Sequence, residues 1–281
     1  MVSIRTGKGT QVYIAGHGLA IEEPAELAPG ISVSPKVITF ETSFGSRGGE
    51  EFQTHAAVLS MERLATFSIV VEHPDGGEAL ARKSWNAIWL FGLLALACRT
   101  HVISLYSGVP EYPHEFSLTN RHTFIRPLPC VAITPDQVRW AANYFDTYSA
   151  LLGERRFRGA QRYYNNAHYL PDADAKIMLL WAGIESLLDV DAELRRSIAL
   201  HAAILHGGDS EAKAARFRDV KRAYDIRSKV VHGSDVDGAK LEAAVEFASD
   251  LLLDLLRRTL EIGRMPKGAE LDEAASRAAF P

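Results

Sequence analysis

The segment Tyr224–Gly233, with the sequence YDIRSKVVHG, brings together side chains that could act on a phosphodiester. Arg227 supplies a permanent cation whose planar fork of donors suits a phosphate group. His232 follows five residues later and supplies the side-chain type that exchanges protons near neutral pH. A cation that holds a phosphate and an imidazole that moves a proton are together sufficient for phosphodiester cleavage.

The same residues also admit a structural interpretation. Arg227 and Asp225 could form an ion-pair network at a helix end, and His232 before Gly233 could cap the helix C-terminus. Five residues on an ideal helix rotate a side chain by about 140°. Arg227 and His232 therefore share a site only if the helix ends near Gly233, or if two copies of the segment face each other across a dimer axis.

Helices must position this segment, because helical periodicity dominates the chain after Pro129. Thr134 is followed by Pro135 and, three positions after the threonine, by Gln137, which predicts a capping box and a helix to about Leu152. Further helices are predicted over residues 155–169, 172–188, 191–206, 211–229 and 236–262. Consecutive helices with short connections predict a helical bundle.

At these residues the sequence resembles the HEPN superfamily, most closely its ApeA-like branch, over roughly residues 135–262. The segment Tyr224–Gly233 is similar to that branch's Tyr-Asp-x-Arg-Ser-x-x-Val-His-Gly signature and contains the wider Arg-x4–6-His motif. Residues 181–188 and 195–205 are similar to two other helices of the branch. For these residues the resemblance implies an all-α HEPN-type antiparallel helical bundle. With the α+β pattern of residues 1–130 described below, the expected fold class is an α+β N-terminal domain followed by that bundle.

The resemblance also implies roles for individual residues. His232 would act as general acid and base, and Arg227 would hold the phosphate and stabilise the transition state. Ser228 would orient either group, and Glu185 would brace the motif by bonding to Arg227, although a buried ion pair between helices explains Glu185 equally well. Tyr224 and Asp225 are supporting residues of the signature. No metal and no cofactor are expected.

The function implied is that of a metal-independent endoribonuclease, a toxin or antiviral-defence effector that forms a homodimer through its helical domain. The alternative is a non-catalytic HEPN module that binds a nucleotide, RNA or a protein. Some HEPN proteins carry a tyrosine two residues after the histidine as a nucleotidylation target. Ser234 occupies that position in this chain, so regulation of that kind is not expected.

The overall charge excludes a whole-chain positive field, since 31 Lys and Arg stand against 35 Asp and Glu, a formal charge of -4. The stretch from Lys213 to Lys229 nevertheless holds seven basic and two acidic residues, a local charge of +5. Its candidate RNA contacts are Arg216, Arg218, Lys221, Arg222 and Lys229. A second basic group within residues 155–164 alternates with aromatic residues, which could stack on bases or belong to the core.

Residues 1–130 have a different character, with 12 of the 21 glycines and 8 of the 12 prolines. Short strands are predicted at residues 11–15, 31–33, 37–42, 66–72 and 101–107, with a helix over 78–99. We therefore expect an α+β domain over residues 1–130 that could sense a ligand or regulate the rest. The helical domain is expected over 131–265 and a fraying tail over 266–281.

Other motifs give no further site. Cys98 and Cys130 lie too far apart in sequence for a paired metal-ligand motif, so two free thiols are expected. The apolar run from Trp85 to Cys98 has 14 residues, whereas a membrane span needs about 20. The first residues lack the layout of a signal peptide. These features predict a cytoplasmic protein without a membrane partner.

Overall fold

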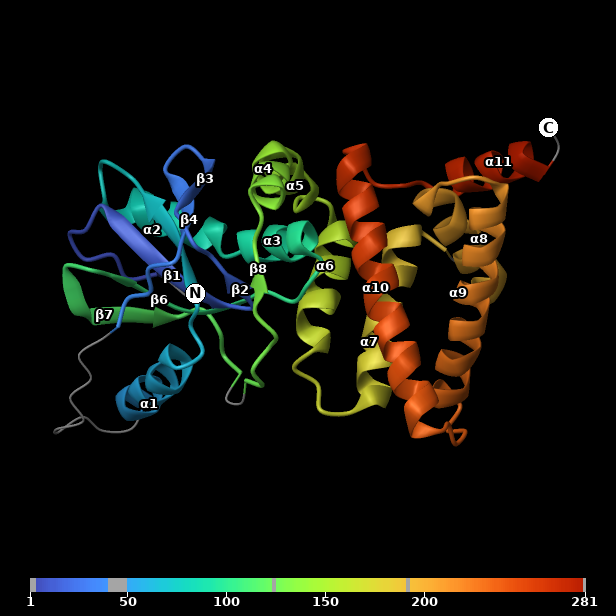
Figure 1. The fold of residues 1–281 in the computed structure, drawn as a ribbon, viewed down its shortest axis with the longest axis horizontal. Coiled ribbons are helices and arrows are strands. Elements are labelled where there is room, and N and C mark those ends of the chain that lie inside the picture. Colours follow the sequence, from blue (N-terminus) through green and yellow to red (C-terminus); the bar gives the residue numbers. More distant parts are fainter. Residues whose placement is uncertain (1–3, 40–49, 123–124, 191–192, 280–281) are drawn as a thin grey trace. The chain divides into compact units, whose positions relative to one another are not determined.

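The computed structural model describes residues 4–39, 50–122, 125–190 and 193–279 (Figure 1). The chain divides into two compact units, Met1–Phe145 and Asp146–Pro281, which we call the sheet unit and the helical unit. This agrees with the predicted order of an α+β part followed by a helical part. The division falls after Phe145 and not after Cys130, because α4 (Pro135–Asn143) packs against α3 (Leu90–Cys98) and β3 (Ala25–Ala28).

The sheet unit is built on a six-stranded sheet in which every neighbouring pair of strands is antiparallel. The strand order is β3 (Ala25–Ala28), β4 (Ile31–Ser34), β5 (Phe67–Glu72), β1 (Gln11–His17), β6 (Ile103–Val109) and β7 (Tyr112–Leu118). Two short strands, β2 (Leu19–Ala20) and β8 (Val131–Ala132), pair in parallel beside it.

The central strand β1 explains why the sheet holds together. Every residue from Val12 to His17 is buried, so β1 is covered on both faces, and its backbone pairs with β5 on one side and β6 on the other. Gly16 lies where β1 passes under aromatic rings, and a Cβ there would come within 2.6 Å of the Phe67 ring. Only glycine allows this close approach.

The described part of the sheet unit also contains the helices α1 (Glu50–Glu62), α2 (Gly77–Ala87), α3 and α4. The single helix predicted over residues 78–99 is instead two helices, interrupted at Ile88 and Trp89. All nine residues of α3 are buried, which accounts for its strongly apolar sequence. Within the described ranges, no helix has both the length and the apolar character needed to cross a membrane.

The strand predictions at residues 11–15, 31–33, 66–72 and 101–107 each correspond to an observed strand. The prediction at 37–42 was wrong for residues 37–39, which form no strand, and its other residues lie outside the described part. Helix α1 and strands β3 and β7 were not predicted. β3 is short and contains two alanines, and β7 contains Pro113, so neither has the composition of a typical strand.

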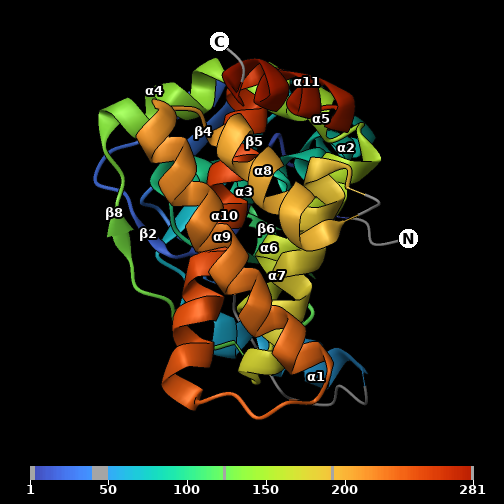
Figure 2. The same ribbon diagram turned by 90° about the vertical axis from the view of Figure 1, so that its right-hand side faces the viewer.

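The helical unit contains α5 (Phe145–Leu151), α6 (Arg155–Ala167), α7 (Ala173–Leu188), α8 (Leu194–His206), α9 (Ser210–Val231), α10 (Gly238–Ile262) and α11 (Gly268–Ala279). Helix α7 packs against α6 and α10, and α8 packs against α9, as Figure 2 shows from the side of α9. The buried face of α10 includes Leu241, Leu252, Leu255 and Leu256, and Gly263 ends the helix in a left-handed conformation.

Two predictions at the ends of this unit need correction. The capping box of Thr134 and Gln137 is present, but its helix α4 ends at Asn143 and α5 follows, so no continuous helix runs to Leu152. The segment predicted to fray contains α11, which packs on α8 and buries Leu271. The segment is rich in alanine and glutamate, which favoured a frayed tail. Its amphipathic pattern, which buries one leucine, instead gives a helix packed on α8.

Candidate functional site

The segment Tyr224–Gly233 forms about the last two turns of α9 and its C-terminal cap. Gly233 takes a left-handed conformation with a φ of 70°. Its N–H donates to the Val230 carbonyl at 3.0 Å, and the Ser234 N–H donates to the Lys229 carbonyl at 2.9 Å. This pair of bonds is a Schellman motif, so the glycine of the signature is explained by helix termination.

Arg227 lies on the side of α9 that faces α7. Its Nη2 atom is 3.2 Å from Oε1 of Glu185, and the two side chains are only 22% and 23% exposed. Its guanidinium also lies over the Tyr224 ring, 5.3 Å from the ring centre. An ion pair between two helices and a cation–π contact within α9 therefore fix the arginine in one orientation.

Arg227, Glu185 and Tyr224 form a cluster with a fourth residue, the core tryptophan Trp181, which packs against Tyr224. Trp181, one turn before Glu185 on α7, meets the Tyr224 ring edge to face at 5.2 Å and is fully buried. Among the described residues, Trp181 Nε1, Glu185 Oε1 and Arg227 Nε are buried atoms without a hydrogen-bond partner. Buried polar atoms are normally satisfied, so three such atoms in one cluster are unusual, and all three are closed off from solvent.

Burial also changes the acidity of two members of the cluster. It raises the pKa of Glu185, and the nearby Arg227 cation opposes that rise. Burial likewise raises the pKa of Tyr224, while Arg227 lowers it and Glu185 raises it further. Arg227 is thus the charge that opposes protonation of Glu185 in a partly dry site.

His232 has different surroundings from Arg227. Its side chain is exposed, and its backbone N–H still donates to the Ser228 carbonyl at 3.1 Å. Because His232 remains bonded into the last helical turn, the rotation of about 140° from Arg227 is kept. The helix end near Gly233 does not by itself bring the two side chains to one face, which leaves the second chain of a dimer as the way to combine them.

The structural interpretation of the sequence proposed an ion pair between Asp225 and Arg227. The structure instead pairs Asp225 with a residue of α8. Asp225 accepts two hydrogen bonds from Arg195 at the start of α8, at 2.5 Å and 2.6 Å. This bidentate contact ties α9 to α8 on the surface. Arg195 was not among the predicted site residues, and nothing in its sequence spacing pairs it with a residue 30 positions away.

The basic stretch of α9 is less open than its sequence suggests. Arg216 lies 3.5 Å from Asp254 on α10, and Arg222 pairs with Asp219. Lys221 lies over the Phe217 ring at 5.2 Å. The side chains that remain on the exposed side with helical spacing of four and seven residues are Arg218, Arg222 and Lys229. These three are the better candidates for contacting RNA phosphates.

The second basic group, in α6, has a structural role. Arg156 donates to the carbonyls of Ser186 and Leu187 at the end of α7, and Arg158 donates to the Leu152 carbonyl. Phe157 and Tyr164 are almost completely buried. Arg155, Arg162 and Tyr163 are exposed, so the group divides into a core face bonded by arginines and a solvent-facing side that keeps one aromatic ring.

A cavity of about 750 Å³ opens beside the Arg227–Glu185 pair, between α6, α7, α8 and α11. Its lining is polar and consists of Arg156, Glu185, Ser186, Asp189, Val190, Glu193, Ser197, His201, Gly268, Ala269 and Asp272. Glu185 thus belongs both to the cavity wall and to the cluster around Arg227. In the part of the chain that is described, no group of three or more His, Cys, Asp or Glu is arranged to hold a metal ion.

Comparison with known proteins does not extend these observations. The chain matches no protein-family model, and neither curated proteins nor solved structures give a match. The functional argument therefore depends on the residues of the helical unit alone.

Proposed function

We propose that this chain is a cytoplasmic, metal-independent endoribonuclease of the HEPN type, similar to the ApeA-like branch. The observation that carries the proposal is the ending of α9. The segment Tyr224–Gly233 terminates a bundle helix in a Schellman motif, which leaves His232 exposed while Arg227 is held by Glu185 and Tyr224. A fixed cation and an accessible imidazole are the two groups that the chemistry requires.

In the proposed reaction, His232 accepts the proton of a ribose 2′-hydroxyl as its oxygen attacks the adjacent phosphorus. The 5′-oxygen of the next nucleotide then leaves with the proton that His232 had accepted, which returns the imidazole to its neutral form, and a cyclic 2′,3′-phosphate remains. Arg227 stabilises the additional negative charge on the phosphoryl oxygens. A guanidinium has five N–H donors, so contact with Glu185 leaves several of them available for phosphate.

The proposal requires a homodimer. Since Arg227 and His232 point about 140° apart around α9, one phosphate would contact Arg227 of one chain and the histidine of the second chain. Arg218, Arg222 and Lys229 would then flank the site and bind neighbouring phosphates. Ser228 follows Arg227 in the sequence and is half-buried. Its hydroxyl would help to orient the bound phosphate.

The proposal is tested by incubating the purified protein with structured and unstructured RNAs in EDTA. Wild type is expected to cleave, and Arg227→Ala and His232→Ala are each expected to lose about 10²-fold or more of the rate. Lys267→Ala, on the linker before α11, is the matched control with a basic side chain removed elsewhere. Equal cleavage by wild type and both site variants would overturn the assignment.

A second candidate function is a non-catalytic module that binds RNA, a nucleotide or a protein. The observation that favours it is the ion pair with Glu185, which already occupies part of the Arg227 guanidinium. Salt-dependent RNA binding that survives His232→Ala, weakens in Arg227→Ala and is never accompanied by cleavage would select this function.

The biological role we propose is that of a toxin or antiviral-defence effector, with the sheet unit as its sensor or regulatory part. This rests on the resemblance of the helical unit and on the separation of the chain into two compact units. Expression of the wild-type chain is expected to arrest growth under activating conditions, and His232→Ala should relieve that arrest. Arrest by both proteins alike would contradict the role.

A further inference from the structure

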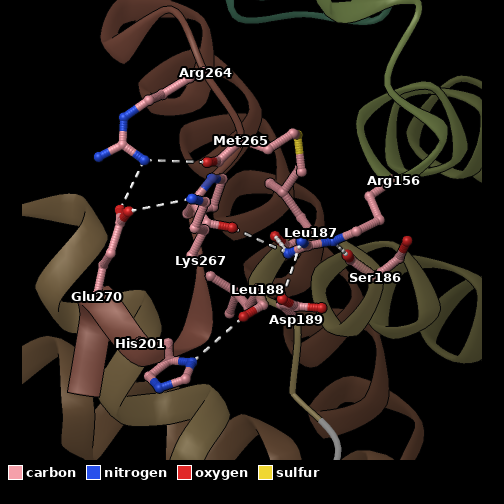
Figure 3. A network of polar contacts seen from close by, with 11 residues as sticks. Arg156, Ser186, Leu187, Leu188, Asp189, His201, Arg264, Met265, Lys267 and Glu270 are labelled. Atoms are coloured by element: carbon pink, nitrogen blue, oxygen red, sulfur yellow. Dashed lines mark hydrogen bonds and ion pairs between the residues drawn. The ribbon is translucent and has the colours of Figure 1, made fainter. Parts of the chain in front are cut away.

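Arg156, a residue of α6 with a permanent positive charge, bonds the linker before α11 to the rest of the helical unit. Arg156 donates to the Pro266 carbonyl, just before α11, at 3.2 Å, and its Nη1 atom lies 3.1 Å from Asp189 (Figure 3). It also holds the last carbonyls of α7. Because arginine keeps its proton at any physiological pH, this attachment does not change with pH.

A second attachment, through His201, is of a different kind. The His201 side chain lies on α8 and is buried, with 3% of its surface exposed. Nδ1 is 3.4 Å from the Leu188 carbonyl at the end of α7, and Nε2 is 2.9 Å from Oδ1 of Asp272 on α11. The first of these contacts is visible in Figure 3. One imidazole thus connects the end of α7 to α11.

Both partners of His201 are acceptors, a carbonyl oxygen and a carboxylate oxygen. A neutral imidazole carries one N–H and must leave the other nitrogen facing an oxygen lone pair. The imidazolium carries two N–H groups and satisfies both contacts at once. The geometry is therefore complete only when the ring is protonated.

The cavity that His201 lines carries more negative than positive side chains. The cavity that His201 lines contains four carboxylates and one guanidinium, namely Glu185, Asp189, Glu193 and Asp272 against Arg156. Arg156 is already paired with Asp189.

We propose that His201 is a proton-dependent latch for α11, which holds the helix against α7 and α8 when the ring is protonated and loosens it when the proton is lost. The protonated ring stabilises the docked helix, so the stabilisation is present at low pH and declines as pH rises through the range in which the ring titrates. Loss of the proton removes the Leu188 contact and the charge of the Asp272 contact, while Arg156 keeps the linker attached.

The latch has a consequence for the site at the end of α9. Gly268, Ala269 and Asp272 of α11 form part of the wall of the cavity that contains Glu185. Release of α11 would admit water to Glu185 and weaken its hold on Arg227. This consequence rests on the proposed ribonuclease function, whereas the latch itself does not.

The latch is tested by hydrogen exchange of the α11 amides in the full chain between about pH 5.5 and 8, corrected for the intrinsic pH dependence of exchange. In wild type, protection of residues 268–279 is expected to fall roughly fivefold across this range. In His201→Gln, which cannot titrate, the fall is expected to disappear. His206→Gln, on the same helix, is the matched control and should behave as wild type.

Asp272→Asn provides a second variant: the carboxylate is exposed and asparagine has the same size, so the fold is kept, and the pH dependence should also flatten. A wild-type α11 whose corrected protection does not change with pH would overturn the latch. So would a pH dependence that survives in His201→Gln. Because the readout is amide protection, its failure is distinct from a failure of RNA cleavage.

Discussion

The two units of the chain use charged residues in different ways. In the sheet unit, Arg82 pairs with Glu78 and Arg139 with Asp136, each within about one helical turn on the surface. The helical unit has local pairs too, such as Arg222 with Asp219, but other pairs link different helices, as Arg227–Glu185, Arg216–Asp254 and Arg195–Asp225 do. Exposed pairs contribute little to stability, and this includes Arg195–Asp225, whereas removing one partner of the largely buried Arg227–Glu185 or Arg216–Asp254 pair would leave a charge uncompensated.

This difference shows where chemistry can be placed. The sheet is held by its backbone ladder and by the apolar faces of β1, β5 and β6, and its polar side-chain bridges, such as Lys83 to the Pro29 and Glu72 carbonyls, add to that ladder. A bundle has no such ladder between its helices, and polar contacts between helices define their register. The residues that could act on RNA, Arg227 above all, are also residues that hold the bundle together. Stability and activity must therefore be measured separately for each variant.

The largest expected effect on stability tests whether the sheet unit is packed more rigidly than the helical unit. Gly16 in β1 and Gly183 in α7 both lie close to neighbours, but a Cβ at Gly16 would meet the rings of Phe67 and Phe91, which cannot move aside. A Cβ at Gly183 would meet the end of the Leu252 side chain, 2.7 Å away, which can rotate. Calorimetry should show that Gly16→Ala lowers the free energy of unfolding by about 3 kcal/mol.

Gly183→Ala should cost less than 1 kcal/mol, because alanine favours the helix by about 1 kcal/mol over glycine and offsets the clash. Equal losses for Gly16→Ala and Gly183→Ala would contradict the idea that the sheet unit is the more rigidly packed of the two.

The next effect concerns the bridge between α7 and α9. Arg227→Ala leaves the largely buried Glu185 carboxylate without its cation, which should lower the free energy of unfolding at pH 7 by about 2 kcal/mol. Arg227→Ala combined with Glu185→Gln removes the unpaired charge and should recover most of that loss. Urea unfolding of the single and double variants measures both values.

The pH dependence of this effect has a definite sign. Burial raises the pKa of Glu185 in the folded chain, so its contribution to stability is present below its ordinary pKa near 4.5 and is lost as pH rises through the higher folded value. Without Arg227 the pKa rises further and the loss becomes larger. A stability profile of Arg227→Ala that matches wild type between about pH 4 and 8 would show that the bridge is not formed.

The smallest effect concerns the end of α9. Gly233 has a φ of 70° and open space around it, so Gly233→Ala introduces backbone strain but no clash. The expected loss is about 1 kcal/mol, and Gly233→Asn should lose less because asparagine tolerates the left-handed conformation. Thermal unfolding compares the two variants, and a gain in stability for alanine would show that the cap is not formed in solution.

Much of the helical unit follows from its sequence, because residues such as Leu252, Leu255 and Leu256 repeat with the helical period and Gly263 marks a helix end. The N-terminus of α4 followed from Thr134 and Gln137 for the same reason, since capping is local. The break at Ile88 and Trp89 did not, because every residue of α3 is buried and the apolar run continues without a stop signal.

The candidate site was only partly predictable. The contact of Arg227 with Glu185 was anticipated, but the contact of Asp225 with Arg195 and that of His201 with Asp272 depend on how helices far apart in sequence pack. Arg216 looked available for RNA, but it faces Asp254 because the side of α9 that carries it packs against α10. Charge along a sequence does not specify which face of a helix is buried.

The measurement that tests the central claim most directly is complementation between two inactive chains. Arg227→Ala and His232→Ala are coexpressed so that mixed dimers form, and RNA cleavage in EDTA is compared with each variant alone. If each site takes Arg227 from one chain and His232 from the other, the mixture should regain on the order of a quarter of the wild-type activity. Mixed dimers that form and remain as inactive as the separate variants would contradict a site shared between two chains.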